Sequence, residues 1–121
     1  MIPLYLRTMV IMQTIFHITA RHDWQEAFPA GAYTADSLSS EGFIHCSTAD
    51  QILGVANSRF RGQEGLVLLA IDSSRVRPEI RYEDCYETGQ QFPHIYGPLN
   101  LDAVSEVLPF NPKPDGSFEL L

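Results

Sequence analysis

Basic residues are scarce in this sequence. Its 121 residues include eight Lys plus Arg against fifteen Asp plus Glu, which gives a net charge of −7. Proteins that bind nucleic acid through its phosphates normally carry a basic patch. The arginines here are scattered, with only a close pair at 59 and 61 and a loose group at 75–81. We therefore expect no nucleic-acid partner, although a local arginine cluster could hold one small anionic ligand.

Cysteine is also rare, and long apolar runs are missing. Cys46 and Cys85 are too few for a disulfide scaffold, so we expect two reduced thiols in a cytoplasmic protein, with a single bridge between them left open. No stretch approaches the roughly 20 apolar residues that span a bilayer, so no membrane partner is expected. The apolar start, residues 1–11, is expected to be an extension before one domain at 12–121. The sequence does not indicate the oligomeric state.

Short apolar segments dominate the rest of the chain. Runs rich in β-branched and apolar residues predict strands at 13–20, 42–47, 65–72 and 79–85. Helices are predicted at about 23–28 and 48–60, the second with capping-box spacing between Thr48 and Gln51. The two prolines in "FPHIYGP" predict a strand that is short or at an edge. Because strands outnumber helices without regular alternation, the fold class is α+β with mixed or antiparallel sheets.

Three histidines, His17, His45 and His94, lie in otherwise apolar segments. A polar ring buried in such a segment must find a hydrogen-bond partner. A single histidine of this kind is more often a satisfied core group than a ligand-binding one. Here there are three, and Thr19 and Ser47 each follow one of them by two positions, so a binding pocket and a structural role are about equally favoured.

Neighbouring residues add to this candidate pocket. Arg81 and Glu83 share one face of the alternating strand at 79–85 with Cys85. If this face lines the pocket, Arg81 is suited to hold a carboxylate or phosphate; otherwise the pair is a solvated ion pair worth little. Tyr96, beside a Gly-Pro turn, would supply an aromatic wall.

Two other chemistries use the same residues. His17, His45, Cys46 and His94 are all of types that zinc accepts, but they lack the closely spaced pairs of structural zinc sites, so we expect no metal. Cys46 precedes a predicted helix and is a candidate nucleophile. Cysteine is also among the most commonly buried residues, which favours an inert thiol at this position.

Several segments together resemble a family catalogued as domain of unknown function 952. They are "IFHIT" (15–19), "EGFIHCS" (41–47), "LVLLAID" (66–72) and "FPHIYGPL" (92–99), with Trp24, Gln51, Arg81 and Glu83. The resemblance implies an ADP-ribosyltransferase-like fold. Such a fold is a split β-sandwich of two small sheets around a cleft for NAD, with two main helices here near the N-terminal half.

The same resemblance implies roles for individual residues. His17 and Thr19 match a histidine motif that contacts the nicotinamide side of NAD, and Ser47 and His45 would be cleft residues. Transferases of this type usually carry a glutamate on a later strand, where this sequence has His94. Glu83 is the nearest acidic alternative, but its place in the chain does not match.

Two hypotheses follow for the function. In the first, the domain binds NAD or a related small nucleotide through His17, Thr19, Ser47, Arg81 and Tyr96, and is an ADP-ribosyl or related transferase. His45 or His94 would then be its general acid or base, a role suited to imidazole. In the second, it is a non-catalytic ligand-binding or interaction module that has lost the catalytic glutamate.

Overall fold

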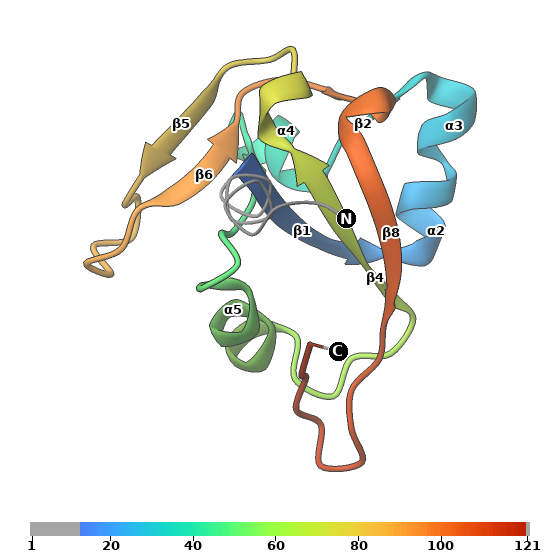
Figure 1. The fold of residues 1–121 in the computed structure, drawn as a ribbon, viewed down its shortest axis with the longest axis vertical. Coiled ribbons are helices and arrows are strands. Elements are labelled where there is room, and N and C mark those ends of the chain that lie inside the picture. The colour runs from blue at the N-terminus through green and yellow to red at the C-terminus, as the bar shows by residue number, and fades with distance from the viewer. Residues whose placement is uncertain (1–12, 121) are drawn as a thin grey trace, which may run out of the picture.

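Short antiparallel strands and short helices make up the computed structural model, which describes residues 13–120 (Figure 1). The strands are β1 (Thr14–Ala20), β2 (Ala32–Tyr33), β3 (Ile44–His45), β4 (Leu66–Asp72), β5 (Ile80–Glu83), β6 (Phe92–Ile95), β7 (Leu99–Asn100) and β8 (Val104–Phe110). The helices are α2 (Arg21–Gln25), α3 (Ala27–Ala30), α4 (Asp36–Ser40) and α5 (Ile52–Arg59), with 3₁₀ turns η1 (Ser73–Arg75) and η2 (Leu101–Ala103). The predicted N-terminal extension, residues 1–11, lies outside the described residues.

The strands form three small sheets, in the orders β1–β4–β8, β2–β7 and β3–β6–β5, and all their pairings are antiparallel. The α+β class is therefore confirmed, but two sheets were expected and three are present. The additional sheet is the β2–β7 pair, with two paired residues on each strand. A bridge between Phe16 and Ser47, with both N···O distances 2.8 Å, joins β1 to the chain just after β3.

β4 is the centre of the core. Its side chains alternate between two apolar clusters, with Val67, Leu69 and Ile71 in one and Leu66 and Leu68 in the other. This explains the continuous apolar run at 65–72, because a strand covered on both faces has no polar side. Figure 1 shows α2 and α3 on one side of the molecule and the β5–β6 pair on the opposite side, with β1, β4 and β8 between them.

The helices differ from prediction at their ends. The segment predicted to be helical over 48–60 begins its regular helix, α5, only at Ile52. Half of the capping box is present before it, since Thr48 N–H donates to Gln51 Oε1 at 3.0 Å. The helix predicted at 23–28 is divided into α2 and α3, and Gly31, with φ of 81°, ends the second. α4 was not predicted. No helix of the described part of the chain is long and apolar enough to cross a membrane.

The proline-containing segment 92–99 forms a short strand, as its sequence predicts, but not at an edge. β6 has four residues and lies between β3 and β5. Pro93 lacks an N–H, yet its carbonyl accepts a hydrogen bond from Cys46 N–H at 3.0 Å. β6 therefore pairs with β3 along one edge and with β5 along the other, which brings residues of the three strands together.

The core position of β4 gives a direct stability prediction. Leu69 is fully buried, whereas Val107, its cross-strand partner on β8, is 40% exposed. Leu69→Ala should lower the free energy of unfolding by about 2–5 kcal/mol, because it leaves a cavity in the core. Val107→Ala should cost less than about 1 kcal/mol. Urea unfolding of both variants measures the difference, and equal losses would contradict this account of the core.

Candidate functional site

His45 and His94 lie directly opposite each other on the paired strands β3 and β6. Their ring centroids are 5.3 Å apart and the rings are nearly perpendicular, at 78°. Phe43 packs against both: its ring is stacked on His94 at 4.0 Å and meets the edge of His45 at 4.9 Å. The aromatic ring of Phe43 thus packs against both imidazoles.

A cavity of about 570 Å³ opens beside these two rings. Its walls come from β1, the segment 45–47, α5, β6 and the loop at 86–90, and include Phe16, Ser47, Arg59 and Tyr86. The volume lies within the range usual for small-molecule sites. Segments far apart in the sequence therefore present polar groups to one space.

The imidazole of His94 is held by a carboxylate that contacts its Nδ1. Its Nδ1 lies 3.0 Å from Glu83 Oε1, and the Tyr96 hydroxyl donates to the same oxygen. The hydrogen bond from Tyr96, and then that from His94, lower the pKa of Glu83, so this carboxylate is ionised and can only accept. Nδ1 must therefore carry the proton in neutral His94, and Nε2 is the nitrogen left to accept a proton.

His45 has a carboxylate partner of its own. Its Nε2 lies 2.7 Å from Glu41 Oε2, and the Tyr86 hydroxyl donates to Glu41 Oε1 at 2.6 Å. These bonds, with Tyr86 the larger cause, lower the pKa of Glu41. The Tyr86 ring lies nearly parallel to that of His45 at 6.1 Å, and the Arg59 guanidinium carbon is 5.5 Å from the Tyr86 centroid. The two histidines thus carry the same kind of carboxylate and tyrosine support.

His17 differs from the other two because both its nitrogens are engaged within the protein. Nδ1 donates to the His45 carbonyl at 2.5 Å, and Nε2 lies 2.7 Å from the Tyr33 hydroxyl, which is 2.9 Å from Thr19 Oγ1. Burial lowers the pKa of His17 to about 4, so the ring is neutral and its Nε2 accepts from Tyr33. His17 therefore connects β1 to β3 through the backbone next to His45.

The sequence that forms this site matches the model of a known protein family. The model of a protein family of unknown function, DUF952, matches residues 18–107, most of the chain. The chain belongs to the DUF952 family. No curated protein matches it.

Solved structures of a Caulobacter crescentus protein, CC0527, resemble this DUF952 domain. The crystal structure is 31% identical, with a TM-score of 0.80, and the match covers 88% of this chain and 94% of that one. The solution NMR structure is 32% identical, with a TM-score of 0.76, and covers 88% and 91%. These similarities establish a shared fold and do not state a function.

The DUF952 domain brings four of the predicted site residues to the cavity: His17, His45, Ser47 and His94. Thr19, predicted to pair with His17 on a ligand, lines a second cavity of about 600 Å³, which His17 also lines. Its hydroxyl and His17 Nε2 both lie against Tyr33. The pair shares a face of β1, but its polar atoms are bonded to the protein.

Arg81 and Tyr96 lie outside the residues that line the first cavity. Arg81 donates twice to Glu79, at 2.9 and 3.0 Å, and its guanidinium carbon lies 4.4 Å from the Tyr96 ring centroid. Tyr96 contacts the site through Glu83, which accepts a hydrogen bond from its hydroxyl, and through Phe43, whose ring centroid lies 5.3 Å from that of Tyr96. Their predicted contact with a ligand stays a prediction, and the arginine that does line the cavity is Arg59.

Sequence reasoning singled out Glu83 but did not connect it to His94, and it gave Glu41 no role. The alternation at 79–85 correctly placed Glu83 with Arg81 and Cys85, but nothing in it indicated that β5 pairs with β6 beside His94. Glu41 is four residues before His45, outside the strand, so strand periodicity carries no signal for it. Tyr86 and Arg59 reach the site from a loop and from α5, and only the folded chain brings them there.

The two thiols have opposite environments. Cys46 is buried in the core, and burial raises the pKa of its thiol, which argues against a nucleophile there. Cys85 is exposed.

This difference predicts how the thiols react. With a thiol reagent under native conditions, one thiol should react, and a Cys85→Ser variant should show no thiol reaction until it is unfolded. Rapid labelling of Cys46 in that folded variant would contradict its assignment as an inert core residue.

The burial of neutral His17 predicts a loss of stability in acid. The unfolded chain takes up a proton at His17 below about pH 6.5, but the folded chain does so only near pH 4. The free energy of unfolding should therefore fall as pH decreases through this window, by up to about 3 kcal/mol from this residue. Chemical unfolding at several pH values measures the effect.

The control for this measurement is His17→Asn, which keeps a donor near the His45 carbonyl but does not titrate. The variant should be less stable at neutral pH and should lose less of its stability between pH 6.5 and 4.5. Parallel pH profiles for the variant and the wild type would show that His17 is not the titrating group.

Proposed function

We propose that this DUF952 domain is an enzyme that uses His94 and His45 as a proton-transfer pair on a nucleotide-class ligand bound in the cavity. NAD or a related nucleotide is the candidate ligand. One observation carries the proposal: two histidines on adjacent strands each have one nitrogen held by a glutamate, and both line the same cavity. Carboxylates that orient imidazoles in this way are typical of acid–base catalysis.

The two histidines have complementary roles in this proposal. His94 Nε2 takes the proton from an attacking water or hydroxyl, and the attacking oxygen forms the new bond to the electrophilic atom. The electron pair of the broken bond goes to the leaving atom, which takes a proton from protonated His45. His94 ends protonated and His45 neutral, and proton exchange with solvent restores both. Glu83 and Glu41 stabilise the charged rings.

The chemistry of the cavity supports a nucleotide-class ligand. Phe16, Phe60 and Tyr86 supply aromatic surfaces for a base or nicotinamide ring, and Arg59 is a cation for a phosphate. Ser47 and Ser58 offer hydroxyl groups for ribose hydroxyls. This combination of apolar walls with a few polar groups suits one small ligand.

ADP-ribosyl transfer in an ADP-ribosyltransferase-like fold is the more specific form of this proposal. It needs a carboxylate to support the developing positive charge on the ribose. Glu83 is a carboxylate beside His94, but its Oε1 already accepts from His94 and Tyr96. The contacts therefore favour proton transfer by the histidines over charge stabilisation by Glu83. The non-catalytic module, our alternative, would bind the same ligands without turning them over.

The test is a calorimetric titration of the protein, treated with a chelator to remove any bound metal ion, with NAD, ADP-ribose and AMP. At least one should bind saturably, and Arg59→Ala should weaken that binding about tenfold or more through loss of a charged hydrogen bond. His22→Ala is the matched histidine control, because His22 is exposed on α2 and pairs only with Glu26 among the described residues. It should bind like wild type, whereas His45→Ala should bind more weakly.

Turnover then separates enzyme from binder. Conversion of the bound nucleotide, followed by chromatography, should fall about 10²–10⁴-fold in His94→Asn, while its affinity changes little. Binding without any conversion by the wild type would support the non-catalytic alternative. Failure of all three nucleotides to bind would reject the nucleotide assignment.

A further inference from the structure

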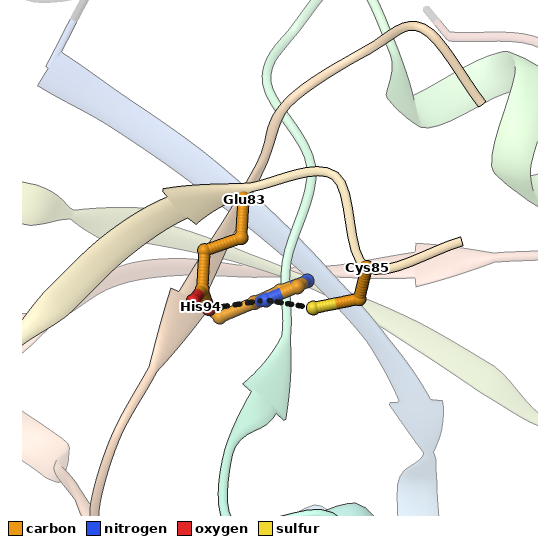
Figure 2. A group of neighbouring side chains, drawn as sticks. All are labelled: Glu83, Cys85 and His94. Carbon is orange, nitrogen blue, oxygen red and sulfur yellow. Dashed lines mark hydrogen bonds and ion pairs between the residues drawn. The ribbon is translucent and has the colours of Figure 1, made fainter. Parts of the chain in front are cut away.

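Three side chains of metal-ligating types lie close together around Nδ1 of His94. Glu83, Cys85 and His94 bring a carboxylate oxygen, a thiol sulfur and Nδ1 within 4.8 Å of one another (Figure 2). Nδ1 is 3.0 Å from Glu83 Oε1 and 3.9 Å from Cys85 Sγ. Of the four residues considered as zinc ligands from the sequence, only His94 belongs to this group.

Two of the three separations between these atoms are close to those around a metal ion, and the third, between the Glu83 oxygen and the Cys85 sulfur, is within 4.8 Å. Neighbouring ligand atoms of a tetrahedral zinc ion lie about 3.3–3.6 Å apart, given its bond lengths of about 2.0–2.3 Å. The oxygen–nitrogen distance is slightly shorter than this and the sulfur–nitrogen distance slightly longer. Cys85 is exposed and follows the end of β5, so its side chain has room to adjust.

The charge and chemistry of the group also favour a cation. Local desolvation, and after it the negative charges of Glu83, Glu41 and Asp84, raise the pKa of the Cys85 thiol, so the neighbouring carboxylates disfavour the free thiolate. A bound cation would relieve this repulsion and stabilise the thiolate. Mixed sulfur, nitrogen and oxygen donors suit zinc, whereas magnesium and calcium prefer oxygen alone.

We propose that Glu83, Cys85 and His94 form a binding site for Zn²⁺, with a water or ligand atom in the fourth position. Cys85 binds as the thiolate and releases its proton to solvent. The single ring proton of His94 moves from Nδ1 to Nε2, so the Nδ1–H···Oε1 hydrogen bond is lost and the Nδ1 lone pair binds the ion. His94 then presents a donor to the cavity where the metal-free ring presents an acceptor. Cation binding itself is independent of the proposed function; only an effect of the ion on catalysis rests on it.

The test is a titration of the chelator-treated protein with Zn²⁺ by calorimetry and with Co²⁺ by absorption. One equivalent of each should bind, with a cobalt–thiolate band in the near ultraviolet. Cys85→Ser should abolish that band and weaken Zn²⁺ binding tenfold or more, and Glu83→Gln should also weaken it. Cys46→Ala and Glu87→Gln, the thiol and charge controls, should bind like wild type.

Nitrogen-15 NMR of His94 supplies a readout independent of affinity. Zinc should shift the Nδ1 signal and place the proton on Nε2. Unchanged Zn²⁺ binding in Cys85→Ser, loss of the thiolate band only in Cys46→Ala, or an unchanged His94 signal would each overturn the site. Nucleotide binding is measured on metal-free protein, so its failure and failure of the metal site are separate outcomes.

Discussion

The two-residue ladder between β3 and β6 sets Ile44 against Ile95 and His45 against His94. The isoleucines are fully buried and fix the register, because a shift by one residue would turn them out of the core. The histidines must then lie side by side on the opposite face, with Phe43 packed against both rings. The bridge from Ser47 to Phe16 ties this ladder to the central β1–β4–β8 sheet.

The surroundings of each histidine decide its role. His17 is buried, neutral and bonded to protein at both nitrogens, so it acts as a structural link between β1 and β3. His45 and His94 each have one nitrogen held by a carboxylate while the ring lines the cavity. No buried side-chain polar atom among residues 13–120 lacks a hydrogen-bond partner. The site is therefore preorganised, which is the condition for efficient proton transfer.

Much of this arrangement can be predicted from local sequence, but the contacts between strands that define the site cannot. The apolar run at 65–72 predicted the central strand, and the alternation at 79–85 correctly grouped Glu83 with Cys85. Local pattern carries no information on which strands pair, so the contact of Glu83 with His94, across β5 and β6, was not predicted. For the same reason the sequence did not indicate that Arg59, from α5, lines the cavity, and the ligand contact predicted for Arg81 stays a prediction.

The position of the ring proton on His94 tests the central claim most directly. Long-range proton–nitrogen NMR of the metal-free wild type distinguishes the two neutral tautomers. The expected result is a proton on Nδ1, held by Glu83, and a shift of the population toward Nε2–H in Glu83→Ala. A ring that carries its proton mainly on Nε2 in the wild type, or that does not respond to loss of Glu83, would contradict the account.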